Sequence, residues 1–262
     1  MQSKTTGLRN LDMKAYLRLS IPFLEIAEQE RIVAELDLLQ GIIEKKKEQL
    51  KAYDQLAQSI FYTMFGDPID NPKGWEVKEL IELYRFIDYR GKTPNKKTEG
   101  IPLITAKNIR KGTIDHSVAE YISEFEHKNR LTRGIPEKGD LLFTTEAPLG
   151  NAAIADLDVY ATAQRLIVLQ KRDNSLLNNI YVLYYILSDQ FQEDLLKQAT
   201  GSTIKGIKGS KLEKIKVPVP PLSLQEEFAE KVEAIERQKA LVQQSIVETQ
   251  TMFDCTMDKY FG

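Results

Sequence analysis

The chain contains 262 residues, and its 36 Lys and Arg residues nearly balance its 38 Asp and Glu residues, for a net charge of −2. This balance excludes a histone-like polycation. The 42% apolar and 28% charged residues are typical of a folded globular protein, of a length that allows one large or two small domains.

Cysteine usage and hydropathy limit the cellular compartment. Cys255 is the single cysteine, which excludes an intrachain disulfide and a cysteine-based zinc site. Apolar runs such as residues 101–104 are far too short to span a bilayer, and no apolar stretch follows the first Lys as in a secretion signal. We therefore expect a cytoplasmic protein without contact to a membrane.

An internal repeat organises the sequence. Residues 5–66 match residues 201–262 without a gap, at a constant offset of 196 positions. The hydrophobicity classes agree widely. The identical pairs are Pro22/Pro218, Gln29/Gln225, Glu30/Glu226, Phe65/Phe261 and Gly66/Gly262.

The two copies contain predicted long helices, which we assign to residues 22–66 and 221–262. After the opening prolines, apolar residues recur in the same steps of four and three in both copies, a 3.5-residue period that favours a coiled coil. Two ordinary amphipathic helices remain the alternative. Lys239, Thr249 and Thr256 interrupt the second stripe; they are tolerable if they lie near water, but they also weaken an isolated hairpin. The predicted interface residues are Ile32, Leu36, Leu39, Ile43, Leu50, Tyr53, Ile60, Phe228, Val232, Ile235, Val242, Ile246 and Phe253.

Residues 67–220, between the helices, have a different texture. They contain short β-rich runs (IPLITA, DLLFTT and QRLIVLQ), Gly and Pro punctuation and one apolar helix-like stretch around residues 180–196. The fold class is therefore α+β: one mixed α/β domain flanked by two long helices. Because one helix enters this domain and the other leaves it, helices paired within the chain must form an antiparallel coiled coil.

Most enzyme classes lack their signatures in this sequence. It contains no GxGxxG or GxxxxGK[ST] phosphate loop, no GxSxG elbow, and no AdoMet-binding loop with its catalytic tetrapeptide. His116 and His127 are not in a metal-ligand spacing and are expected on the surface. Asp70, Glu76 and Lys78 resemble a nuclease set only weakly. We expect no metal or cofactor, and the chain by itself should transfer no methyl group.

Two segments of the central domain are strongly basic. Residues 90–111 hold seven bases against Glu99, and residues 197–216 hold six lysines against Glu213, for local charges of +6 and +5. Such local charge suits a phosphate backbone, and Gly201, Gly206 and Gly209 could leave backbone N–H groups free for phosphates. Two solvated loops are the alternative interpretation.

Base recognition needs forked donors and amides, because Arg suits guanine and Asn or Gln suits adenine. Candidates near the basic segments are Arg90, Asn108, Arg110, Asn151, Gln164 and Arg165, although the last two could equally be structural. The complete set of predicted DNA-binding residues is Arg90, Lys92, Thr93, Lys107, Asn108, Arg110, Lys111, Asn151, Gln164, Arg165, Lys205, Lys208 and Lys211.

The order of motifs along the chain resembles a target-recognition domain of a type I restriction-modification specificity subunit (HsdS), and the two heptad helices are similar to the central helices of that family. The resemblance covers essentially the whole chain. The motifs are GW (74–75), DYRGKTP (88–94), GIPLIT (100–105), KGTID (111–115), YIS (121–123), KGDLLFTT (138–145), APLGN (147–151), AQRLIVL (163–169), YVLYYILS (181–188), TGSTIKGI (200–207) and IKVPVPPLSLQEE (215–227).

The resemblance implies a noncatalytic subunit that reads a half-site in the major groove of double-stranded DNA. Its helices would act as a spacer and would dock modification (methyltransferase) subunits, with restriction subunits joining later. Family members normally carry two recognition domains, whereas here residues 1–21 match only the tail of a first domain. The resemblance therefore implies a half-subunit or truncated form.

Other functions and assemblies remain open at this point. A coiled-coil assembly or decoy protein would bind modification subunits without productive DNA recognition, and a nuclease is a third hypothesis. Two identical chains side by side would place a recognition domain at each end of the coiled coil and would read two inverted half-sites. Pairing with a different half-subunit is the rival to this homodimer.

Overall fold

The computed structural model describes residues 2–5, 8–18, 23–91, 93–163 and 165–261. They fall into two compact units, one formed by residues 1–50 and 241–262 and the other by residues 51–240. The helices are α1 (Met13–Tyr16), α2 (Ile26–Phe65), α3 (Leu80–Leu83), α4 (Glu124–Arg130), α5 (Asn179–Leu187), α6 (Asp189–Gln198), α7 (Gly209–Leu212) and α8 (Leu222–Phe261). The strands are β1 (Gln2–Thr5), β2 (Leu8–Leu11), β3 (Glu76–Glu79), β4 (Tyr84–Asp88), β5 (Ile101–Ile104), β6 (Tyr121–Ile122), β7 (Leu141–Thr145), β8 (Leu149–Ile154), β9 (Ala161–Thr162), β10 (Leu166–Lys171) and β11 (Lys216–Val219).

The secondary structure follows the sequence repeat. The long helices α2 and α8 contain 40 residues each, and they begin at residues 26 and 222, which is the 196-residue offset of the repeat. The short helices α1 and α7 contain four residues each and begin at residues 13 and 209, at the same offset. The repeat therefore extends to elements outside the heptad stripes.

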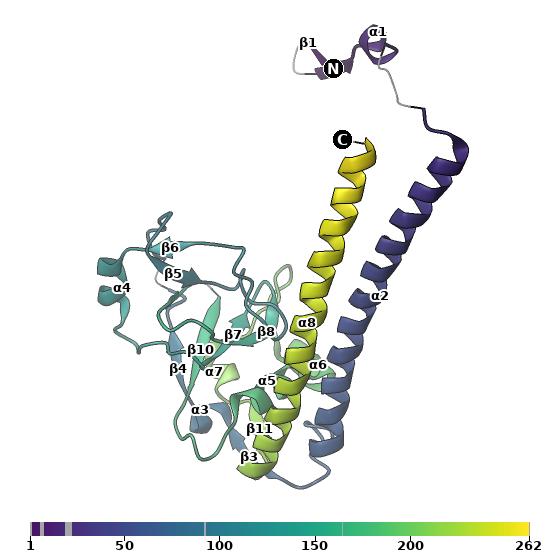
Figure 1. The fold of residues 1–262 in the computed structure, drawn as a ribbon. Coiled ribbons are helices and arrows are strands. Elements are labelled where there is room, and N and C mark those ends of the chain that lie inside the picture. Colours follow the sequence, from purple (N-terminus) through teal and green to yellow (C-terminus); the bar gives the residue numbers. More distant parts are fainter. Residues whose placement is uncertain (1, 6–7, 19–22, 92, 164, 262) are drawn as a thin grey trace. The chain divides into compact units, whose positions relative to one another are not determined.

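The two long helices pair in opposite directions within each unit (Figure 1). In the first unit, Arg31 Nη2 donates to the Tyr260 hydroxyl at 2.7 Å, and Lys46 Nζ donates to the Ser245 carbonyl at 3.2 Å. Residues later in α2 thus contact residues earlier in α8, so the two helices are antiparallel. In the second unit, Lys239 Nζ forms an ion pair with Asp54 at 2.7 Å. The predicted long antiparallel helices are confirmed.

The predicted interface residues are all withdrawn from solvent to some degree. Seven are buried, namely Ile32, Leu39, Ile43, Phe228, Val232, Ile235 and Ile246. The other six are half-buried, namely Leu36, Leu50, Tyr53, Ile60, Val242 and Phe253. This burial is what a helix–helix seam requires, and the role of each residue in the interface stays a prediction.

A polar contact lies inside the helix pair of the first unit. Thr249 is buried, and its hydroxyl donates to the Ser245 carbonyl at 2.7 Å and accepts from Lys46 Nζ at 2.9 Å. The hydroxyl is therefore satisfied without water. Lys239, in the second unit, is half-buried between Asp54 and Glu236.

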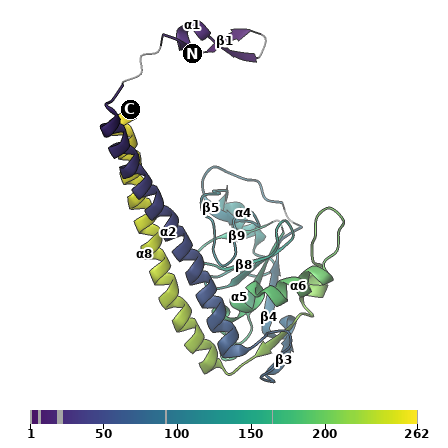
Figure 2. The same cartoon turned by 90° about the vertical axis from the view of Figure 1, so that its right-hand side faces the viewer.

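The centre of the second unit is a four-stranded antiparallel sheet of order β4-β10-β7-β8, with α5 packed against β8 (Figure 2). Every residue of β7 is buried, and so are residues 166–169 of β10. A three-stranded sheet (β6-β5-β9) and a two-stranded sheet (β11-β3) complete the domain. The DLLFTT and LIVLQ runs thus form the two central strands.

The core of this unit includes the ends of both long helices. Phe61 and Phe65 of α2 each contact both Tyr181 of α5 and Phe228 of α8, with ring centroids 4.7 to 5.8 Å apart. Aromatic pairs at these distances stabilise a core beyond their buried area. The compact unit therefore extends past the boundaries 67–220 that the sequence texture indicated, because α2 and α8 contribute core side chains to it.

Candidate nucleic-acid interface

A polar cleft of about 590 Å³ lies at one end of the strands of the four-stranded sheet. Strands β4 and β7 both run antiparallel to β10, so the last residues of β4 and β7 lie beside the first residues of β10 at this end of the sheet. The lining residues are Asp88, Arg90, Gly91, Thr105, Ala106, Lys107, Arg133, Glu146, Ala147 and Arg165. Three predicted DNA-binding residues, Arg90, Lys107 and Arg165, are therefore brought together.

Thr145, at the end of β7, forms hydrogen bonds with three separate segments of the chain beside the cleft. Its buried hydroxyl accepts a hydrogen bond from Arg90 Nη1 at 3.2 Å and donates to the Arg165 carbonyl at 3.2 Å. Its own carbonyl accepts from the Ile207 backbone N–H at 2.9 Å. One buried residue thus links both basic segments of the sequence, which lie about 100 positions apart along the chain.

Arg90 is firmly held by an acid. Its Nε and Nη2 donate to the two carboxylate oxygens of Asp88 at 2.9 and 2.7 Å. Burial raises the pKa of Asp88, but the hydrogen bonds from Arg90 outweigh burial and hold this pKa below its usual value. The carboxylate therefore stays charged and neutralises Arg90 at pH 7.

Arg165 occupies a strained position beside another acid. Its φ of +63° lies in the left-handed region that side chains other than glycine rarely adopt. Its Nε forms an ion pair with Glu146 Oε1 at 3.0 Å, and both side chains are close to half exposed. Arg165 therefore remains accessible from the cleft.

Arg133, Asp88 and Glu146 also line this cleft, although the sequence pattern did not indicate them. Arg133 is exposed and donates to the Asp88 carbonyl at 2.5 Å, which places it at the wall of the cleft. It lies more than 20 positions from either basic segment. No local charge pattern could have indicated it.

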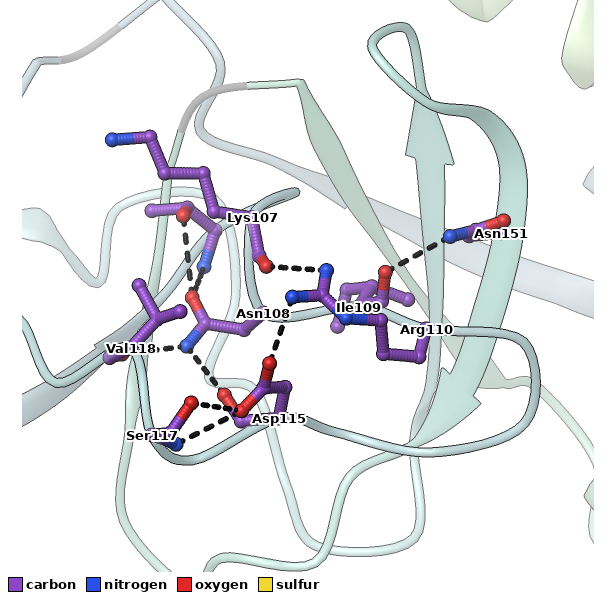
Figure 3. Close-up of polar contacts among 9 residues, drawn as sticks. Lys107, Asn108, Ile109, Arg110, Asp115, Ser117, Val118 and Asn151 are labelled. Atoms are coloured by element: carbon purple, nitrogen blue, oxygen red, sulfur yellow. Dashed lines mark hydrogen bonds and ion pairs between the residues drawn. The ribbon is translucent and has the colours of Figure 1, made fainter. Parts of the chain in front are cut away.

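The loop after β5 is built around a buried amide, that of Asn108 (Figure 3). Asn108 is 1% exposed, and its Oδ1 accepts from the backbone N–H and the hydroxyl of Thr105 at 3.0 and 3.2 Å. Its Nδ2 donates to the carbonyls of Asp115 and Val118. This differs from the expectation that Asn108 contacts a base, because its amide is used inside the loop.

Asn151 has a similar supporting position on β8. Its Nδ2 donates to the Ile109 carbonyl at 2.9 Å (Figure 3). Its backbone N–H and carbonyl form hydrogen bonds with the Thr144 hydroxyl. The side chain thus anchors the loop to the sheet. Asn151 is half-buried, and its predicted contact with a base stays a prediction.

The remaining described candidates of the first segment are exposed. Arg110 donates to the Lys107 carbonyl at 2.8 Å and pairs with Asp115 at 2.7 Å, while hydrogen bonds from Ser117 and, to a lesser extent, from Arg110 lower the pKa of Asp115. Lys111 lines a different cavity. Thr93 is exposed, whereas Lys92 and Gln164 lie outside the described residues.

The second basic segment forms a hairpin next to the cleft. The backbones of Thr200 and Gly206 exchange two hydrogen bonds, and Gly206 also bridges to Glu146. The N–H of Gly206 is therefore used within the hairpin, contrary to the expectation that it is free for a phosphate. Gly201 has a φ of +106°, and a Cβ there would meet the Ile204 carbonyl oxygen at 2.1 Å. Both glycines shape the turn.

The lysines of this hairpin and of the following turn point into solvent. Lys205, Lys208 and Lys211 are exposed, and Lys211 Nζ donates to the Gln198 carbonyl at 2.9 Å. None of the six lysines in residues 197–216 forms an ion pair with a carboxylate of the described residues. Their charge is available to an external anion.

A family model for the type I restriction modification DNA specificity domain matches residues 72–250. The chain belongs to this family. The matched range includes every residue that lines the cleft and the whole 200–206 hairpin. The resemblance to type I specificity subunits and the predicted fold class are thereby confirmed.

Two specificity subunits from Methanocaldococcus jannaschii are similar in sequence. The type I restriction enzyme MjaVIII specificity subunit is 24% identical over 90% of this chain and 59% of its own length. The putative MjaX specificity subunit is 28% identical over 84% of this chain and 53% of its length. The chain thus spans somewhat more than half the length of these relatives.

Solved structures support the fold of this specificity-domain protein. The HsdS subunit from Thermoanaerobacter tengcongensis has a TM-score of 0.54 and 24% identity, covering 92% of this chain and 60% of that one. The type I S subunit from M. genitalium has a TM-score of 0.61 and 16% identity, covering 99% and 67%. At these identities, the likeness concerns the fold alone.

The described part of the chain contains no group of three or more His, Cys, Asp or Glu side chains that could hold a metal ion. Two members of the weakly nuclease-like set, Lys78 and Glu76, form an ion pair with each other. His116 pairs with Asp156 at 2.8 Å. Among the described helices, none has the length and hydropathy needed to cross a bilayer.

Proposed function

We propose that this chain is a noncatalytic, cytoplasmic specificity subunit of a type I restriction-modification system that reads a half-site of double-stranded DNA. The modification and restriction subunits are its proposed protein partners, docked through α2 and α8. A second copy of the chain, or another specificity chain, is the proposed partner for reading a second half-site.

The observation that carries this proposal is the convergence of the two basic segments at one cleft. The described lining residues include four cations, Arg90, Lys107, Arg133 and Arg165, and two carboxylates, Asp88 and Glu146. The lysine-bearing hairpin adjoins the cleft through Gly206 and Ile207. An excess of cations around arginines that can reach base edges is the arrangement that DNA recognition requires, because phosphate contacts position and base contacts specify.

The electrostatic environment supports contact with phosphates over contact with a neutral partner. Lys205 of the hairpin and Lys208 of the following turn are exposed, with no carboxylate partner in the described residues. Each cation that contacts a phosphate releases counterions from the DNA. It contributes about −0.9 to the slope of log affinity against log salt concentration. We assign these lysines to phosphate contacts and the cleft arginines to the bases.

Selection from randomised duplexes tests the proposal. The full chain, mixed with a cognate modification subunit, should enrich one sequence motif, and its affinity should fall steeply as salt rises. Binding without enrichment and without salt dependence would overturn the proposal and would favour the assembly or decoy function. Light scattering of the chain at micromolar concentration reports whether two copies associate.

A further inference from the structure

The two acids that line the cleft differ in how fully their oxygens are used. Both carboxylate oxygens of Asp88 accept hydrogen bonds from Arg90. Glu146 pairs with Arg165 through Oε1, and its Oε2 has no partner among the described residues. A free carboxylate oxygen on a DNA-facing surface repels phosphates, so general DNA affinity does not account for Glu146.

Stability does not account for Glu146 either. The side chains of Arg165 and Glu146 are 46% and 42% exposed, and an ion pair at such exposure contributes little to folding. We therefore look for the role of Glu146 in the recognition of DNA.

The two cleft arginines differ in the same way. Arg90 donates from Nε, Nη1 and Nη2 to Asp88 and Thr145. Arg165 engages Glu146 through Nε, and its two terminal nitrogens have no partner within the part of the chain that the structure describes. Arg165 thus presents a free fork of donors beside the free acceptor of Glu146.

The backbone holds this pair in a defined place. The Arg165 carbonyl accepts from both the N–H and the hydroxyl of Thr145, at 2.8 and 3.2 Å. Glu146 bridges to Gly206, where an added Cβ would lie 3.2 Å from Glu146 Cβ, so the hairpin packs closely against it. Side chains that start from such constrained positions are suited to base recognition, which needs preorganised geometry.

The geometry points to Arg165 and Glu146 as a paired recognition element for a G·C base pair in the major groove. Guanine presents two acceptors, O6 and N7, to the Arg165 fork, and the neighbouring cytosine N4 presents a donor to Glu146 Oε2. Thymine has an acceptor and a methyl group at the corresponding edge, so Glu146 would reject it. This inference rests on the proposed function and names the residues that give it specificity.

The test repeats the selection from randomised duplexes with the full chain and its modification subunit, for the wild type and for Arg165→Ala, Arg165→Lys and Glu146→Gln. The wild-type motif should contain one position that requires G·C. Arg165→Ala and Arg165→Lys should lower the preference at that position by roughly 5- to 150-fold, because neither side chain donates as a fork. Glu146→Gln should relax the same position and should raise affinity for unrelated duplexes, since it removes a repelling charge.

Two further variants separate recognition from a structural role. The charge-swapped Glu146→Arg/Arg165→Glu variant restores an ion pair and should still lose the G·C preference. Lys138→Ala removes another exposed ion pair, with Asp158 at 3.1 Å outside the cleft, and should leave the motif unchanged. Thermal unfolding of each variant checks that the domain is intact.

The outcomes distinguish this inference from the proposed function. A wild type without any enriched motif would overturn the proposed function itself. A wild type with a motif that Arg165→Ala and Glu146→Gln leave unchanged at every position would overturn only the assignment of this pair. Recovery of the G·C preference by the charge-swapped variant would show that the ion pair is merely structural.

Discussion

The two basic segments of the domain have similar charges in the sequence and opposite electrostatic environments in the fold. In residues 90–111, four of the six described bases, Arg90, Lys96, Lys107 and Arg110, form ion pairs with acids. In residues 197–216, no lysine pairs with a carboxylate of the described chain. The charge of the first segment is therefore partly neutralised by acids, and that of the second is not.

The difference shows that local charge in a sequence does not measure the charge offered to a partner. Glu120, which lies outside the first segment, approaches both Lys96 and Lys107, at 2.7 and 3.9 Å. Asp88 and Asp115 lie just beyond its two ends. We infer that the first segment supplies mainly positioned side chains and that the second supplies mainly free charge.

The largest expected effect is a loss of folding stability, and it tests whether a residue of the first basic segment supports the fold. Asn108→Ala removes the amide that satisfies Thr105, Asp115 and Val118, and should lower the free energy of unfolding by about 3 kcal/mol. Chemical denaturation of the full chain measures this change. Asn95→Ala is the matched control on an exposed side chain of the same segment and should change stability by less than about 0.5 kcal/mol. Equal effects would contradict the supporting role of Asn108.

An intermediate effect compares the lysines of the two segments directly. Lys205→Ala/Lys208→Ala should weaken binding to all duplexes by roughly 10- to 30-fold near physiological salt and should reduce the logarithmic salt slope by about 1.8. Lys96→Ala/Lys107→Ala should do less, because Glu120 already compensates part of the charge of these two lysines. Affinity measured over a salt series decides the comparison. A larger loss in the second double variant would reverse our assignment of free charge.

The smallest expected effect concerns Asp88 and pH. Because its pKa in the folded protein is lowered, the stabilisation from the Asp88–Arg90 pair is present above the ordinary aspartate pKa of about 4 and is lost as pH falls below it. Asp88→Asn should therefore lower the free energy of unfolding by about 1 kcal/mol at pH 7, and this difference should shrink below about pH 4.

The control for this variant is Asp158→Asn, which breaks a much more exposed pair with Lys138 and should leave stability nearly unchanged. Asp88→Asn should also steepen the salt dependence of DNA binding, since Arg90 loses its counter-charge. A difference in stability between Asp88→Asn and the wild type that stays constant down to pH 3 would rule out this role of Asp88.

Part of the candidate site could be predicted from residue types and spacing. Arg90, Lys107 and Arg165 were selected for forked or cationic side chains near basic segments, and all three line the cleft. The same reasoning indicates Asn108 and Asn151, whose amides donate to backbone carbonyls within the domain. Residue type states what a side chain can bind, whereas the carbonyls that use up its hydrogen bonds are positioned by the fold.

The sequence by itself determined the long helices, their antiparallel direction, the mixed domain between them and the family. These features depend on periodicity, chain connectivity and motif order, which are local or ordered along the chain. Only the tertiary structure decided which charges remain free and which acid accompanies Arg165. Glu146 lies 19 positions from Arg165, and the pairing of β7 with β10 brings the two together. Electrostatic interactions act over distance in space, and distance along the chain does not predict them.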